Sequence, residues 1–126
     1  MQYRPTAAEL LTDIAQLLEQ DVIDALSGPV QHKVRVAANL ARILEREVTL
    51  APANTARELA TIQRLFDLGP DDPTPLPELR GRLAETLRQS ELPGHDDNEV
   101  WLALVAITRD DLAIAKPTHD DWTGDR

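Results

Sequence analysis

The chain has 126 residues, a formal charge of −9 and no cysteine, which fits one compact soluble domain without disulfide bonds or thiolate metal ligands. It has 13 Lys and Arg against 22 Asp and Glu, and this acidic excess argues against binding nucleic acid or anionic membranes, because both depend on clustered cations. The longest uninterrupted apolar run, residues 100–107, is too short to cross a bilayer, so we expect a cytoplasmic protein.

A short turn joins the first two predicted helices. The capping box Thr6-Ala-Ala-Glu9 predicts the start of a helix that runs to about residue 26. Ser27-Gly28-Pro29 ends it, and a second helix is predicted over residues 30–50, stopped by Ala51-Pro52. Because the connection is short, we expect an antiparallel helical hairpin. The apolar face of the first helix has helical spacing: Leu10, Leu11, Ile14, Leu17, Leu18, Val22 and Leu26.

Three further helices are predicted. A second capping box, Thr55-Ala-Arg-Glu58, opens a helix that ends near Gly69. The proline-dense stretch 69–77 is expected to be an exposed linker, and either Pro75 or Pro77 fits the first turn of the next helix, which carries Leu79, Leu83 and Leu87. The last helix is predicted from about residue 98 to residue 115, where Pro117 stops it, and the acidic end, residues 118–126, is expected to be loose.

These patterns predict an all-α fold. No segment shows the alternation typical of a strand, so we expect residues 1–126 to form a single-domain bundle of about five helices. The second and fifth helices are expected to be central, because their apolar residues point in most directions whereas the other helices have one apolar stripe.

The second predicted helix carries the candidate site. His32, Arg35 and Asn39 line up at helical spacing, roughly opposite a face formed by Val30, Val34, Ala37, Ala41, Leu44 and Val48. We favour a role in packing and hydrogen bonding at a helix crossing or subunit contact. The alternative is a pocket in which these three side chains hold an anionic acyl metabolite through its carboxylate or phosphate group. Asp110 and Asp111 are candidate carboxylate partners for His32. We expect no catalytic residue and no cofactor.

Two His-Asp-Asp triplets, at residues 95–97 and 119–121, raise the question of a metal site. Adjacent His and Asp residues ligate metals in some phosphohydrolases, but the further His and Asp residues that such a site needs are missing. Asp96 with Glu99 three residues later is typical of a helix N-terminus, and the second triplet falls in the expected loose tail. We therefore predict no metal site.

Three blocks resemble those of an uncharacterised family of short bacterial helical proteins, a domain of unknown function. The blocks are Arg4-Pro-Thr-Ala-Ala-Glu-Leu-Leu11, then His32-x-x-Arg35-Val-Ala-Ala-Asn39 with Glu45-Arg-Glu47, and finally Leu112-Ala-Ile114 before Pro117. Members of this family accompany aminoglycoside-phosphotransferase-like kinases and acyl-CoA dehydrogenases, so the resemblance implies an accessory role in acyl-CoA or hydroxy-acid catabolism. The residues after the last block, Ala115-Lys116-Pro117-Thr118-His119, depart from the Asn-Pro-Arg-Tyr expected there.

Two functional hypotheses follow. The favoured one is a non-enzymatic partner protein that docks by helix packing on a kinase-like enzyme, on an acyl-CoA dehydrogenase or on a second copy of itself, through an apolar strip that the bundle leaves uncovered. The second is a small-ligand-binding or catalytic protein with its site at His32, Arg35 and Asn39. A homodimer is plausible for a small Leu-rich bundle, although the spacing sets no symmetry.

Overall fold

A computed structural model describes residues 3–89, 92 and 94–120. Within these residues the regular structure is entirely helical, which confirms the all-α prediction. The α-helices are α1 (Ala7–Leu17), α2 (Gly28–Leu65), α3 (Leu76–Gln89) and α4 (Asp97–Ala115), with a π-helical turn η1 (Leu18–Val22) and 3-10 turns η2 (Ile23–Ala25) and η3 (Pro117–His119). No helix in the described part of the chain has the length and apolar character needed to span a membrane.

The chain forms two compact units. The first comprises Met1–Pro52 with Ala113–Arg126, and the second comprises Ala53–Leu112. Both α2 and α4 run from one unit into the other. The single domain expected over residues 1–126 remains a prediction.

The prediction of five helices is wrong by one, because α2 continues through Pro52. A proline inside a helix lacks the N–H that would bond to the carbonyl four residues earlier, here that of Val48. Ending the helix there would instead leave several backbone donors and acceptors without partners on both sides of the break. The second capping box is consequently unused, and Thr55 lies exposed in the middle of α2.

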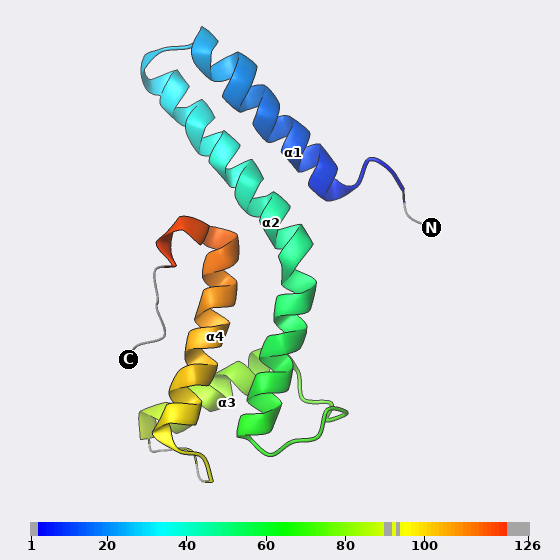
Figure 1. The fold of residues 1–126 in the computed structure, drawn as a ribbon, viewed down its shortest axis with the longest axis vertical. Coiled ribbons are helices and arrows are strands. Elements are labelled where there is room, and N and C mark those ends of the chain that lie inside the picture. Colours follow the sequence, from blue (N-terminus) through cyan, green and yellow to red (C-terminus); the bar gives the residue numbers. More distant parts are fainter. Residues whose placement is uncertain (1–2, 90–91, 93, 121–126) are drawn as a thin grey trace. The chain divides into compact units, whose positions relative to one another are not determined.

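The first unit contains the predicted hairpin, in which α1 and the N-terminal part of α2 lie side by side and antiparallel (Figure 1). The capping box at its start is confirmed: Thr6 Oγ1 accepts the N–H of Glu9 at 3.2 Å, and Glu9 Oε2 accepts the N–H of Thr6 at 2.7 Å. Helical turns extend through η1 and η2 to Ala25, close to the predicted end at residue 26. Gly28 then has a φ of 65°, a left-handed conformation that favours glycine.

The second predicted helix, residues 30–50, is not central. This corrects the expectation, which rested on apolar residues that point in most directions around that helix. Between residues 30 and 50, α2 has two buried residues, Ala38 and Ala41, while Val30 and Leu40 are each 54% exposed. In the fifth predicted helix, now α4, Val100 is buried and most of the other apolar residues are half-buried. The larger apolar side chains are therefore buried chiefly in the second unit.

The core of the second unit lies between the C-terminal part of α2, α3 and α4 (Figure 1). Its buried side chains are Ile62, Leu65, Leu79, Leu83, Leu92 and Val100. The proline-rich linker predicted at 69–77 is non-helical as far as Pro75, and α3 begins at Leu76 with Pro77 in its first turn. At the chain end, η3 occupies the start of the predicted loose tail, while residues 121–126 lie outside the described residues.

A left-handed Asp67 ends α2 within this unit. Its φ is 55°, its N–H donates to the carbonyl of Arg64 at 3.1 Å, and the N–H of Leu68 donates to the carbonyl of Gln63 at 2.8 Å. This is a Schellman motif, whose left-handed position is usually occupied by glycine.

Replacing Asp67 by glycine is expected to raise the free energy of unfolding by about 0.5–1 kcal/mol. Relief of the left-handed conformation outweighs both the extra entropy of a glycine in the unfolded chain and the loss of the 3.8 Å contact between the exposed Asp67 carboxylate and His95 Nε2. Urea denaturation of the two proteins measures this difference. Asp71→Gly is the control, since Asp71 has no positive φ and should gain nothing; equal gains in both variants would contradict the conformational explanation.

Candidate functional site

The hairpin of the first unit is held together by small residues. Its buried side chains form an alanine seam of Ala15, Ala38 and Ala41. Methyl side chains let two helix backbones approach closely, but they bury little apolar area. The hairpin therefore keeps its larger apolar side chains outside its own seam.

An apolar face runs along both helices of the hairpin. Each of its eight side chains is between 45% and 54% exposed: Leu10, Ile14 and Leu17 from α1, and Val30, Val36, Leu40, Leu44 and Val48 from α2. Individual exposed leucines are common on protein surfaces, but a contiguous apolar patch on a soluble protein marks an interaction site.

An ion pair on the other side of the hairpin shows that the apolar residues of both helices share one face. Arg42 donates from Nε and Nη2 to Glu19 Oε1 and Oε2 at 3.1 and 3.0 Å, so Glu19 and Arg42 lie on the same side of the seam. At about 100° per residue, Glu19 is roughly 140–180° around its helix from the three apolar side chains of α1. Arg42 is likewise about 120–160° around α2 from the apolar residues of that helix.

The pKa of Glu19 lies below its ordinary value, chiefly because Arg42 hydrogen-bonds to the carboxylate. The pKa of Arg42 is correspondingly raised by its hydrogen bonds to Glu19. A lowered carboxyl pKa stabilises the fold above the ordinary pKa, and this contribution is lost as the pH falls through the lowered value.

The variant Glu19→Gln should therefore be less stable than the native chain near neutral pH. The difference should vanish once the pH is well below the ordinary Glu pKa of about 4.3, because the native carboxyl is then protonated as well. Urea denaturation at a series of pH values measures it. A stability difference that persists at low pH would show that the packing of the Glu19 side chain, rather than its charge, stabilises the hairpin. Asp71→Asn is the control, because Asp71 is exposed and forms no ion pair among the described residues.

The predicted site residues form a polar row of His32, Arg35 and Asn39 on the exposed surface of α2. Arg35 lies about 20° around the helix from Arg42, so the row begins on the ion-pair side of the hairpin. The carboxylate of Asp110, one of the two candidate partners of His32, binds Arg57 in the second unit. The structure thus leaves the polar row open, and both its interpretations stay predictions.

The end of α4 meets α2 on this same polar side. Arg46 Nε donates to the backbone carbonyl of Ile114 at 2.7 Å, within the first unit. Arg46 is about 40° around the helix from Arg42 and about 160–200° from Leu44. This contact between α4 and the hairpin therefore lies away from the apolar face.

A second polar cluster lies just after Pro52, in the second unit. The buried Asn54 donates from Nδ2 to the backbone carbonyl of Asp110 at 3.1 Å. Arg57 donates to both carboxylate oxygens of Asp110 at 3.1 Å and also to Asn54 Oδ1. Hydrogen bonding to Asp110 raises the pKa of Arg57. This cluster anchors α2 to α4 beyond the proline, which favours a helix that continues over one that breaks.

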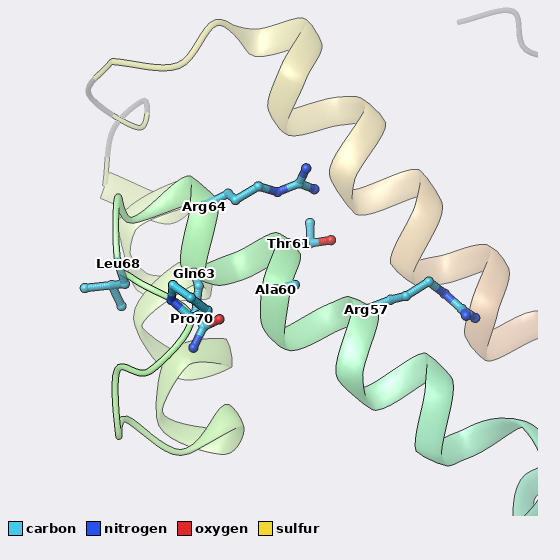
Figure 2. A pocket seen from close by; sticks show the side chains of 7 residues that line it. All are labelled: Arg57, Ala60, Thr61, Gln63, Arg64, Leu68 and Pro70. Atoms are coloured by element: carbon cyan, nitrogen blue, oxygen red, sulfur yellow. The ribbon is translucent and has the colours of Figure 1, made fainter.

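Two cavities lie in the second unit. One of about 390 Å³ is lined by α2 and the segment after it, and Figure 2 shows Arg57 and Arg64 extending on the side of α4 while Gln63 lies beside Pro70. The other, of about 480 Å³, is lined by α2, His95 and α4. The polar row lines neither cavity.

His95 joins three segments of the second unit. Its Nδ1 is 3.2 Å from Glu99 Oε2, and its buried Nε2 is 3.8 Å from Asp67 Oδ1. Asp96 caps α4 as predicted, since Asp96 Oδ1 accepts the N–H of Glu99 at 2.7 Å. His95 therefore lies between the end of α2 and the start of α4 and lines the 480 Å³ cavity, and its buried Nε2 has no hydrogen-bond partner among the described residues.

A metal site is equally unsupported by the other acidic and histidine residues. Among residues 3–89, 92 and 94–120, no three His, Asp or Glu side chains are grouped to hold a metal ion. Asp121 of the second triplet lies outside the described residues.

The sequence predicts an uncovered apolar strip but does not locate it. The helical spacing places Leu10, Ile14 and Leu17 in one broad apolar face together with Leu11 and Leu18. The signal for a separate exposed stripe was the width of that pattern, because a seam made of alanines uses only part of so broad a face.

No curated protein and no solved structure is significantly similar to the chain. A family model described as Domain of unknown function (DUF6285) matches residues 24–119, from the end of the first hairpin helix to η3. The chain therefore belongs to the DUF6285 family, whose domain is of unknown function.

Proposed function

We propose that this protein is a non-enzymatic accessory protein that acts by binding other protein chains through its N-terminal hairpin. The observation that supports this proposal is the exposed apolar face, whose side chains a self-contained domain would bury. The hairpin offers a helical surface of the kind that packs against other helices.

The finer part of the proposal concerns the partner. The Arg4–Leu11 and His32–Asn39 blocks, which carry the resemblance to kinase- and dehydrogenase-associated proteins, both fall on the hairpin. We therefore assign to the protein a cytoplasmic, bacterial role beside a phosphotransferase-like kinase or an acyl-CoA dehydrogenase in acyl-CoA or hydroxy-acid catabolism. We place the binding site for this enzyme at the polar row. Contacts between separately stable proteins are about as polar as the rest of a protein surface and are enriched in Arg.

Affinity purification of the tagged protein from its native cell at low salt tests this role. We expect a kinase-like enzyme or an acyl-CoA dehydrogenase in near-equal amount, identified by mass spectrometry. Arg35→Glu should reduce its recovery at least tenfold without changing the melting temperature, because Arg35 is exposed. Lys116→Glu, a matched charge reversal at another exposed position, should leave the recovery unchanged.

A native chain that is recovered alone would overturn the accessory role. Equal recovery of the enzyme with native protein and with Arg35→Glu would remove the polar row from the contact while leaving the accessory role in place. The small-ligand hypothesis would be supported only if the native chain binds an acyl carboxylate and the Arg35→Ala variant does not.

A further inference from the structure

We infer that a second copy of this chain covers the apolar face, so that two hairpins pack as an antiparallel four-helix bundle about a two-fold axis passing near Ile14 and Leu40. This inference rests on the proposed role of the hairpin as a binding element. It names the first chain that the hairpin binds and leaves the polar row free for an enzyme.

The exposed area has the size that a stable dimer needs. Each of the eight half-exposed side chains offers on the order of 50–100 Å² of apolar surface, so the face offers roughly 400–800 Å². The upper part of that range reaches the roughly 800 Å² per partner of a standard stable interface. Permanent homodimer contacts are also the more apolar class, whereas contacts between separately stable proteins are more polar. A face without a charged centre thus favours a permanent partner.

The two apolar stripes share one centre. In α2, Val36 and Leu44 lie four residues on either side of Leu40, and in α1, Leu10 and Leu17 flank Ile14. Ile14 and Leu40 are each 13 residues from Ser27 at the turn of the hairpin, and therefore lie at about the same height along it. One two-fold axis perpendicular to the helices can then relate both stripes to their copies, as an isologous contact requires.

Charge complementarity also supports an antiparallel dimer. Lys33 and Glu47 lie seven residues before and after Leu40, about 20° from it around the helix. Both are exposed, and neither forms an ion pair within residues 3–89, 92 and 94–120. When two α2 helices run antiparallel and cross at Leu40, each Lys33 meets the partner's Glu47. A parallel arrangement of the hairpins would place α2 against α1 of the partner, and this pairing would be lost.

Sedimentation equilibrium of the purified chain tests the dimer. We expect a dimer at micromolar concentration, and a monomer for Leu40→Glu, because two carboxylates would then meet on the axis. Arg35→Glu introduces the same charge on the other side of the helix and should remain dimeric. Circular dichroism verifies that each variant is helical. A monomeric native chain, or a dimer that Leu40→Glu leaves intact, would overturn the inference.

Charge reversal tests the antiparallel pairing independently of Leu40. Lys33→Glu places like charges opposite each other twice per dimer and should weaken dimerisation on the order of tenfold or more. The double variant Lys33→Glu/Glu47→Lys restores opposite charges and should recover most of the native affinity. Weakening without recovery would show that the two residues do not face each other across the interface.

The absence of cysteine allows a third test in which every introduced thiol is unique. Leu40→Cys should form a disulfide-linked dimer under mild oxidation, because the two copies of this position meet on the axis. Arg35→Cys should not. These measurements use the chain alone, whereas the accessory role is tested by enzyme recovery. A monomeric chain that still recovers the enzyme would refute only the dimer, and a dimer that recovers no enzyme would refute only the accessory role.

Discussion

Replacing Pro52 by alanine is expected to stabilise the protein by up to about 3 kcal/mol, the difference between the two residues inside a helix. Pro52 is exposed and lies between helical residues on both sides. Alanine would restore the backbone N–H facing the carbonyl of Val48 and remove the clash of the proline ring with that carbonyl. The expected rise in melting temperature is on the order of 10 °C for a chain of this size.

Thermal and urea unfolding followed by circular dichroism measure this effect. Pro29→Ala is the matched control, because Pro29 lies in the first turn of α2, where the missing N–H has no helical partner and proline is well tolerated. The control should gain nothing. If Pro52→Ala also gains nothing, the helix has already relaxed around the proline, and its continuity there has little energetic cost.

Leu79→Ala should lower the free energy of unfolding of the second unit by about 3–4 kcal/mol. Leu79 is completely buried among Ile62, Leu83 and Val100. Truncating a leucine in such a place loses the transfer energy of its methyl groups and leaves a cavity. Since a domain of this size has a total stability of only about 5–15 kcal/mol, the loss is large enough to dominate its behaviour.

Trp101 provides a local readout for this variant, since it lies on α4 within the second unit. Its fluorescence during urea unfolding, in a background where Trp122 is replaced by Phe, reports this unit. Leu87→Ala is the control, because Leu87 lies on α3 like Leu79 but is 36% exposed. This variant should lower the free energy of unfolding by less than about 1 kcal/mol. Equal costs for the two variants would contradict the assignment of Leu79 to the core.

Two helix starts were predictable because their determinants are local. The boxes Thr6 with Glu9 and Asp96 with Glu99 involve residues three apart, and both form as expected. The break at Pro52 failed for the opposite reason. The contacts that anchor the helix beyond it join Asn54 and Arg57 to Asp110, more than 50 residues away. Local propensity shows a cost at Pro52 but cannot show the distant contacts that offset it.

The candidate site was predictable only in part, because periodicity shows which residues share a face and not what covers that face. The spacing placed Leu44 and Val48 together with Ala41, yet Ala41 is buried while the two larger residues are about half exposed. It likewise grouped His32, Arg35 and Asn39 in one row without indicating that these residues are exposed. Burial depends on the neighbouring helix, which a single periodic pattern does not contain.

The alanine seam also determines how much sequence change the hairpin can tolerate. Of the 19 possible replacements for Ala15, only glycine is smaller, and glycine weakens a helix by about 1 kcal/mol. Every other residue must enter a site with no exposed surface, where added atoms force the helices apart. In a library of all single substitutions, the seam positions should therefore be nearly intolerant, while the neighbouring residues of the polar row accept many residues without loss of folding.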